Sequence, residues 1–417
     1  MDSSAAGDNG FLAPLRNRDF LRLLISNGLW WQAMGVEQVV IGWLALALTD
    51  SAWWVALIGF FRSAPMPLAG IFGPVIVERF QRRRVIVTGQ SVTFLSIGAV
   101  TLLHLHGALA YWHLAAAAMV TGTVWSLDWP TRRSLFPDLL GKSRVVDAMF
   151  LDNLLQSVTR VLGPLSAGAV VAVIGTRGAL AALTVSAGVS VLVLAGIRTR
   201  SRSPQRPGGL ADSARRCRDG LRYVFGNRTI LGVLLITVAM NLWAFPYMDL
   251  LPVFARDILG TDAFGLGMLG AASGLGNLGG MLLISWLRKT RSLSWIFATA
   301  AMVSCMGLIG FSQSDSLPVS LSILVAVGVG HAGFSVMQST IILVESSDLM
   351  RARAMGTLVI AIGFGPMGRI LAGGMAENFS APVAVGCMAA AALSAIAGVA
   401  FGLRGFVQRK NPAPRSS

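Results

Sequence analysis

Five charged side chains lie inside, or near the ends of, stretches of sequence that are otherwise apolar. They are Glu37, Arg62, Arg160, Asp249 and Arg369. A charge in hydrocarbon costs about 2.5 to 3.5 kcal/mol on insertion scales, so each of these residues is a candidate for a functional site. Asp249 and Arg369 are close enough to the outer ends of their stretches that we expect solvation, or outward extension of the side chain, to satisfy them.

Glu37 and Arg62 should lie at the same depth. Counted from the adjoining ends of two consecutive apolar stretches, both are about 15 Å deep at a rise of 1.5 Å per residue. Because antiparallel helices joined by a short turn make contact easily, we expect an ion pair or a water-bridged pair between them. A change that separates the two would alter the proton affinity of Glu37. A static structural pair is the alternative, because buried ions are usually paired whatever their role.

Two polar residues without a permanent charge, Asn241 and His331, lie in the middle of apolar stretches. A histidine in such a place is a candidate proton carrier, because its ordinary pKa allows it to gain and lose a proton near neutral pH. The alternative is a hydrogen bond to a neighbouring helix. The sequence leaves both interpretations open.

The composition excludes an ordinary water-soluble enzyme. Of the 417 residues, 54% are hydrophobic and only 13% are charged, against about 25% charged in an average soluble domain. Cys217, Cys305 and Cys387 are far apart and show neither a disulfide framework nor zinc-ligand spacing, and no ATP-binding motif occurs. We therefore expect no cofactor and no metal ion.

Twelve apolar stretches are long enough to cross a membrane as helices. We expect them near residues 23–48, 53–77, 85–106, 110–130, 147–174, 178–196, 230–252, 263–287, 293–312, 317–343, 354–376 and 382–403. All but five of the 34 Lys and Arg residues then fall on one side, the exceptions being Arg62, Arg160, Arg177, Arg256 and Arg369. This bias predicts a multi-pass membrane protein with both termini in the cytoplasm. The net charge of +15 therefore no longer favours nucleic-acid binding.

The longest stretch outside the membrane divides the chain into halves of similar length. We expect a cytoplasmic tail at 1–20, a six-helix bundle at 21–197, a cytoplasmic linker at 198–229, a second six-helix bundle at 230–403 and a cytoplasmic tail at 404–417. In the linker, apolar residues recur at helical spacing with arginines opposite, which predicts a basic amphipathic helix on anionic membrane lipids. A solvated linker helix is the alternative.

Matching turns indicate that the two halves are repeats. After the fourth stretch the segment Asp138 to Met149 begins with Asp-Leu-Leu and continues through arginine to Ala-Met, and Asp348 to Met355 does nearly the same after the tenth. Parallel repeats related by an axis along the membrane normal suit alternating access. The expected fold class is all-α, a polytopic membrane protein with twelve transmembrane helices in two pseudo-symmetric six-helix bundles.

The turn between the second and third stretches carries the most specific motif, Gly73-Pro74-Val75-Ile76-Val77-Glu78-Arg79-Phe80-Gln81-Arg82-Arg83-Arg84. It resembles the signature loop of the major facilitator superfamily, although Gln81 replaces the second glycine of that loop and Pro74 takes the place of the first. The resemblance implies that Glu78 caps the eleventh helix and that a loop arginine reaches Asp128 at the end of the fourth. The implied gating residues are Gly73, Glu78, Arg79, Arg82, Arg83 and Asp128.

Further segments narrow the resemblance to the branch of bacterial exporters that includes the enterobactin exporter and macrolide efflux proteins, which implies a place in the bacterial inner (plasma) membrane. They are Leu48 to Ser51, Pro130 to Arg133, Phe136 to Leu139, Arg160 to Pro164 and Pro366 to Gly368. Two glycine patterns, Gly274 to Gly279 and Gly363 to Gly368, fit a dinucleotide fingerprint but lie in apolar stretches. We expect them to pack the eighth and eleventh helices closely against the fifth and second, as in this superfamily.

The resemblance also implies that the first, fourth, seventh and tenth helices line a central cavity. The aromatic and amide residues that these helices would supply are Trp30, Trp31, Gln38, Trp125, Asn241, Trp243, Tyr247, Phe334 and Gln338. Broad aromatic faces with a few amides suit a bulky amphipathic substrate better than a sugar or an inorganic ion. A place in the interfacial aromatic belt is the alternative for any single tryptophan.

The expected function is export of a small amphipathic molecule, drug-like or siderophore-like, by alternating access coupled to protons. The candidate coupling residues are Glu37, Arg62, Arg160 and His331. The expected partners are the substrate, protons and membrane lipids, and the expected state is a monomer. A lipid flippase or a receptor-like binding protein on the same fold, without proton antiport, is the alternative, and an enzyme is not expected.

Overall fold

A computed structural model describes residues 12–67, 81–141, 144–198, 222–288, 290–347 and 350–402. After a short turn, η1 (Ala13–Arg16), the first helical group consists of α1 (Arg18–Thr49), α2 (Ala52–Ser63), α4 (Arg82–Leu105), α5 (Tyr111–Ser134), α6 (Phe136–Leu140) and α7 (Val145–Ala195). The second helical group consists of α9 (Arg228–Ala239), η3 (Met240–Ala244), α10 (Tyr247–Val253), η4 (Phe254–Ile258), α11 (Ala263–Leu287), α12 (Leu293–Ser312), α13 (Leu317–Glu345), α14 (Arg351–Ile362), α15 (Gly365–Asn378) and α16 (Ala381–Gly402). Most of the expected linker and both chain ends lie outside the described residues.

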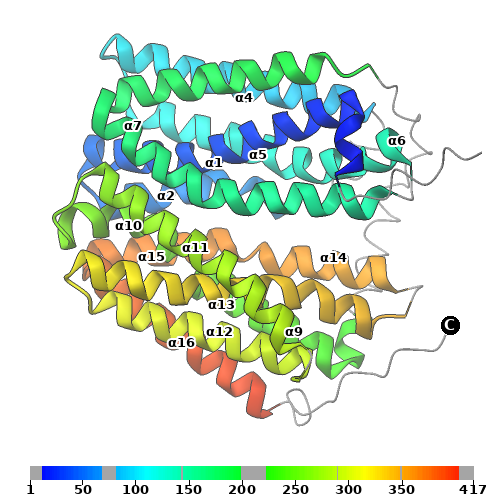
Figure 1. Ribbon diagram of the computed structural model, residues 1–417. Helices are drawn as coiled ribbons and strands as arrows, with labels where there is room; N and C mark the ends of the chain where they lie inside the picture. Colours follow the sequence, from blue (N-terminus) through cyan, green and yellow to red (C-terminus); the bar gives the residue numbers. More distant parts are fainter. Residues whose placement is uncertain are drawn as a thin grey trace, which may run out of the picture.

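The described chain is helical and its helices follow the expected order. By length and composition, nine of its helical segments can cross a membrane. One of these, α7, holds two of the expected crossings because the chain doubles back at Gly175. α2 and α5 pack against each other in the same bundle (Figure 1). The expectation of an all-α polytopic membrane protein is therefore confirmed.

The two helical groups lie side by side, the first above the second in the view of Figure 1. Within the first group α1 and α4 pack on α7, and within the second α11 and α12 pack on α13. Between the groups, α7 packs on α11 and α2 packs on α15. These are the pairings expected between the fifth and eighth helices and between the second and eleventh.

Polar caps set the starts of several helices, where the first N–H groups have no partner within the helix. Asn17 accepts two backbone hydrogen bonds at the start of α1, and Ser51 accepts one at the start of α2. Asp262 and Ser292 cap α11 and α12 in the same way. Asp50 ends α1 in the left-handed conformation, at φ 50°, which aspartate tolerates better than most residues. The turn between α1 and α2 is therefore very short.

α7 contains the fifth and sixth expected helices in one segment of 51 residues. Gly175 forms the turn between them, with φ 70° and ψ 177°. Because a side chain would be strained at this φ, glycine is favoured where the two helices join without a loop. The second arm of α7 is held by hydrogen bonds of 2.8 Å from Ser190 to Ser26 of α1 and from Thr184 to Thr101 of α4.

The seventh helix is longer than the expected 230–252. It runs from Arg228 to Ile258, and two of its parts, η3 and η4, are π-helical. Pro246 and Pro252 lie beside these wide turns, where the missing N–H of proline interrupts the regular ladder of hydrogen bonds. The extra length places Asp249 well before the end of the helix, whereas the sequence placed it near the outer end.

Glycines bring the two helical groups into backbone contact. A Cβ added at Gly168 of α7 would lie 2.6 Å from a backbone oxygen of α11, and one added at Gly274 of α11 would lie 2.8 Å from the backbone oxygen of Arg160. A Cβ added at Gly373 of α15 would lie 2.7 Å from an alanine side chain of α2. Helices pack this closely in membranes where residues are small. The packing interpretation of Gly274 is thereby confirmed.

Polar contacts join the two groups at the end of the bundle that holds the α1–α2 turn. The Glu377 carboxylate, near the end of α15, accepts hydrogen bonds from the Ser51 hydroxyl at 2.8 Å and from the Trp53 N–H at 3.2 Å. It thus caps α2 from the other helical group. Arg256 contacts Asp50 at 2.5 Å. We call these four residues, Glu377, Ser51, Arg256 and Asp50, the clasp. At the opposite end of the bundle, α14 packs on α9 and α13 of its own group.

Glu377→Ala should open the clasped end. Loss of a helix cap costs about 1 kcal/mol, which changes the ratio of closed to open molecules about five-fold. Spin labels are placed at Ala110 and Gln313, in turns of the first and second groups at this end. The distance between the two labels, measured by electron paramagnetic resonance, should then be longer. Asp315→Asn, which removes an exposed acid from the same end, is the matched control. An unchanged distance distribution in Glu377→Ala would show that the clasp does not hold this end closed.

Candidate functional site

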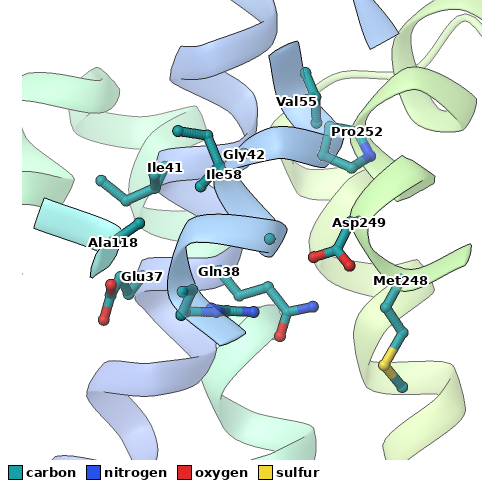
Figure 2. A pocket seen from close by; sticks show the side chains of 12 residues that line it. Glu37, Gln38, Ile41, Gly42, Val55, Ile58, Ala118, Met248, Asp249 and Pro252 are labelled. Atoms are coloured by element: carbon teal, nitrogen blue, oxygen red, sulfur yellow. The ribbon is translucent and has the colours of Figure 1, made fainter. Parts of the chain in front are cut away.

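A small cavity lies where α1 and α2 of the first helical group meet α10 of the second (Figure 2). Its volume of about 20 Å³ is enough for a water molecule but not for an organic substrate. Figure 2 shows Glu37 and Asp249 on opposite sides of the view. The cavity is lined by Glu37, Gln38, Ile41, Gly42, Val55, Ile58, Gly59, Arg62, Ala118, Met248, Asp249 and Pro252.

Glu37 and Arg62 line this one cavity, so they share a level in the bundle as expected. The expected direct ion pair is not formed: no ion pair or hydrogen bond joins these two side chains, both of which lie in the described chain. The Glu37 carboxylate is buried and accepts a hydrogen bond of 2.8 Å from the Thr121 hydroxyl of α5. The carboxylate therefore lies toward α5, and the charge of Arg62 acts on it without a direct contact. A bridging water stays a prediction.

Asp249 and Arg369 correct a second expectation, because neither is satisfied by solvent at the end of a helix. Asp249 is 8% exposed, and its Oδ2 lies 2.8 Å from Nε of Arg369 on α15. The N–H of that Nε does not point at the carboxylate, so the contact is an ion pair without a hydrogen bond. The carboxylate also lies against Gly59 of α2, where an added Cβ would collide with it.

Two acids and two arginines therefore surround the place where the helical groups meet. Glu37 and Arg62 come from the first group, and both line the cavity. Asp249, which lines the cavity from the second group, is paired with Arg369. Because each charge has an opposite charge nearby, the cost of burying the four together is much smaller than the cost of burying any one alone.

Arg160 lies further along the interface, halfway along the first arm of α7. Its backbone packs on Gly274 of α11, and its charge acts on Tyr247 and His331 of the second group. The side chain is exposed although protein atoms surround it on most sides. Both observations agree if the guanidinium faces space inside the bundle, and not the lipid. Arg160 is therefore the coupling candidate that is most open to a ligand.

His331 lies among aromatic rings. Its ring is 4.9 Å from that of Phe245 and 6.0 Å from that of Tyr247. The Tyr247 hydroxyl contacts the Ser273 hydroxyl at 3.4 Å. The hydrogen bond expected from His331 to a neighbouring helix is not found among the described residues, and its buried Nε2 has no partner there. The ring is packed, but its polar atom is left unsatisfied.

A second polar cluster lies within the first helical group and centres on Arg132, which is 2% exposed. Its guanidinium makes hydrogen bonds to Asp128 at 2.6 Å, Asn27 at 2.9 Å, Ser26 at 3.0 Å and Gln90 at 3.1 Å. These partners come from α1, α4 and α5. The cluster therefore fixes the rotation of three helices about their own axes.

Of the expected gating residues, the described chain includes Arg82, Arg83 and Asp128. Arg132, one turn along α5, contacts Oδ2 of Asp128 at 2.6 Å, whereas Oδ1 has no hydrogen-bond partner among the described residues; a contact between Arg79 and Asp128 stays a prediction. Arg82 instead contacts Asp138 at 2.8 Å, and Arg83 donates to a backbone oxygen at the end of α7 at 2.8 Å. The other expected gating residues, Gly73, Glu78 and Arg79, lie outside the described residues.

Several residues expected to line the cavity are committed to contacts within their own group. Gln338 donates to the Thr237 hydroxyl at 2.7 Å, and Asn241 donates to the Thr237 carbonyl at 2.9 Å. The Phe334 ring is stacked on Phe297, with 5.3 Å between centroids. Trp30 is buried under the Arg132 guanidinium, and Tyr247 is buried as well. Asn241 is partly exposed, as are the other four expected residues, Trp31, Gln38, Trp125 and Trp243.

Two important polar residues, Arg132 and Glu377, have no direct signal in the sequence. Arg132 was visible only as part of a motif at the end of the fourth stretch, and its burial depends on how α5 is rotated. Glu377 lies in a polar segment that reads as an ordinary helix end. An acid near the end of the eleventh stretch, opposite a Ser-x-Trp helix start, is the pattern that could have indicated the clasp.

The profile of the transmembrane secretion effector family matches residues 9–415. The multidrug efflux pump Tap of Mycolicibacterium fortuitum is 23% identical over 364 residues, which is 82% of this chain and 85% of Tap. The staphyloferrin A transporter of Staphylococcus aureus is 22% identical over 139 residues, 33% of this chain and 35% of that transporter.

Solved structures of transporters have the same fold. The bacterial homologue of the human lysosomal transporter Spinster, in its inward-facing and occupied conformation, has a TM-score of 0.74 and 16% identity, over 96% of this chain and 99% of that one. The nucleoside transporter NupG has a TM-score of 0.74 and 12% identity, over 93% of this chain and all of the other (100%). With the family match over nearly its whole length, the chain belongs to the transmembrane secretion effector family of the major facilitator superfamily, a family of membrane transporters and not of enzymes.

Proposed function

We propose that this transporter exports a small amphipathic molecule in exchange for protons across the bacterial cytoplasmic membrane. The similarity to proteins named as a multidrug efflux pump and a siderophore transporter supports export. The partly exposed aromatic and amide residues Trp31, Gln38, Trp125 and Trp243 suit a substrate with both apolar and polar parts.

The observation that carries the proton coupling is the environment of Glu37. The carboxyl is buried where the two helical groups meet, beside a cavity of water size and without a direct counter-ion in the described chain. Such a group is able to exchange a proton when its surroundings change. Movement of the second group, which carries Asp249 on the far wall, would change the cavity and the charges around Glu37.

The clasp gives this movement a direction. It holds the groups together at the α1–α2 end, where the bias of basic residues predicts the outer face of the membrane. Opening of the clasp would expose Glu37 to the outside, and closing it would expose the same carboxyl to the cytoplasm. One carboxyl that alternates between the two sides, and that binds its proton only when the substrate is absent, would exchange protons for substrate.

Glu37→Gln should abolish proton-driven accumulation while leaving passive exchange intact, because the amide keeps the hydrogen bond to Thr121 but does not titrate. One pH unit drives about ten-fold accumulation per proton, so accumulation should fall from that level to about one-fold. The measurement uses inverted vesicles with an acidic lumen and two amphipathic dyes, cationic ethidium and an anionic naphthalene dye. Asp315→Asn, an exposed acid, is the control. Wild-type accumulation of both dyes in Glu37→Gln would contradict the assignment, and dye movement without proton flux would favour a flippase.

The ion pair of Asp249 and Arg369 is proposed to be structural, unlike Glu37. Removal of one partner leaves a buried charge and should destabilise the fold by about 3 kcal/mol; this is the low end of the usual range because Arg369 is 20% exposed. Thermal unfolding should show lower midpoints for Asp249→Asn and for Arg369→Gln, with part of the loss recovered in the double variant. Additive losses in the double variant would show that the pair does not interact.

The proposed orientation places both termini in the cytoplasm. Cysteines introduced at His106 and Asp315, in exposed turns of the described chain, should react with an impermeant thiol reagent in intact cells. The native Cys217, in the linker, should react only after the membrane is opened, and Cys387→Ser removes the exposed native thiol. Labelling of Cys217 in intact cells, with His106 and Asp315 protected, would reverse the orientation.

A further inference from the structure

We propose that Arg160, Tyr247 and His331 form a subsite for an aromatic carboxylate, so that the exported molecules include organic anions with an aromatic body. The proposal rests on the proposed export function and specifies its substrate class. It begins from a physical constraint: a transporter of organic molecules needs a site larger than the water-sized cavity beside Glu37. Arg160 is exposed although protein atoms surround it, and we infer that it faces space within the bundle.

Arg160 is a cation without a counter-ion in the described part of the chain. No ion pair or hydrogen bond of its guanidinium is found there. Its neighbours across the interface, Tyr247 and His331, carry no negative charge at neutral pH. An uncompensated charge at mid-membrane depth is costly, and a negatively charged ligand would remove that cost.

The other charges in this part of the interface are balanced. Asp249 is paired with Arg369, and the charges of Glu37 and Arg62 act on each other across their cavity. Arg160 is therefore the excess positive charge of this set. A neutral ligand would leave the imbalance unchanged, and a cationic ligand would increase it.

The surroundings of Arg160 supply a second, independent indication of a ligand. His331 is 5% exposed, and its Nε2 has no hydrogen-bond partner in the described chain. A buried polar atom without a partner is costly, so this atom also needs a group from outside. The Arg160 backbone packs on Gly274, the adjoining Ser273 contacts the Tyr247 hydroxyl, and the Tyr247 and His331 rings are 6.0 Å apart, so one ligand is able to serve both.

The chemistry of these groups specifies the ligand. A guanidinium binds a carboxylate with two parallel hydrogen bonds. The Phe245 ring, which is partly exposed, lies 4.9 Å from the buried His331 ring, and an aromatic ligand packs well on such a ring. An anionic group joined to an aromatic body therefore satisfies the cation, the rings and the unpaired nitrogen together.

The test compares three probes that share one ring system: 2-naphthoate, 2-naphthamide and 2-naphthylmethylammonium. Binding to the purified full-length protein in nanodiscs of neutral phosphatidylcholine is measured by calorimetry. We expect naphthoate to bind about 10-fold to 100-fold more tightly than the amide, the range for a hydrogen bond to a charged group, and the ammonium to bind most weakly. Equal affinities of the carboxylate and the amide would overturn the proposal.

Two variants of Arg160 and one control variant test whether Arg160 is the source of the preference for the carboxylate. Arg160→Gln should reduce the affinity for naphthoate to that for the amide, whereas Arg160→Lys, which keeps a point charge but loses the planar fork, should keep part of the preference. Arg177→Gln removes one exposed arginine from the same helix outside the interface and should bind naphthoate as the wild type does. Retention of the full preference in Arg160→Gln would overturn the proposal. If Arg160→Gln does not fold, the wild-type probe series and Arg160→Lys test the proposal. A reduced or absent preference for naphthoate in Arg160→Lys would support the assignment of Arg160. An undiminished preference would contradict it.

Failure of this inference is distinguishable from failure of the export function. If vesicles accumulate ethidium under a pH gradient but the purified protein does not prefer naphthoate, the export function is supported and the anion subsite is contradicted. If the protein prefers naphthoate but its vesicles accumulate neither dye, the subsite is supported and the export function is contradicted.

Discussion

A charge inside a membrane must meet an opposite charge or a set of hydrogen bonds, and this constraint orders the interior of the protein. Arg132 satisfies it with partners from three helices, and Asp249 satisfies it with Arg369 on α15. Because each contact needs a particular rotation of the helices that carry it, the polar clusters select one packing among the many that apolar surfaces alone would allow. These contacts make each helical group rigid.

The same constraint separates residues that hold the fold from residues that are free to act. Arg132, Asp249 and Arg369 have direct ionic partners, and they serve the packing. Glu37 and Arg160 lack them in the described chain, and both lie where the two helical groups meet. Function is thus proposed for the charges that the fold leaves incompletely satisfied, at the interface where relative movement would change their surroundings.

The sequence predicts features that depend on distance along a helix axis, but it does not predict features that depend on the rotation of a helix about that axis. The order and depth of the helices follow from the length of apolar stretches, and the common level of Glu37 and Arg62 followed from counting residues. Their contact did not, because adjacent positions on a helix point about 100° apart, and the rotation of α1 turns Glu37 toward Thr121. Gln338 was assigned to the cavity for the same reason, although its amide bonds to Thr237 within the second group. Glu78 and its loop stay a prediction, because they lie outside the described residues.

The single-residue turn at Gly175 has a mechanical consequence. A loop of several residues between two helices provides slack, so that either helix is able to shift or tilt without its neighbour. Here the fifth and sixth helices form one segment joined at Gly175, and that slack is missing. A displacement of the first arm of α7, which carries Arg160 and lies against α11, is therefore transmitted directly to the second arm and through Ser190 and Thr184 to α1 and α4. Movement at the interface between the helical groups would therefore also move helices on the far side of the first group.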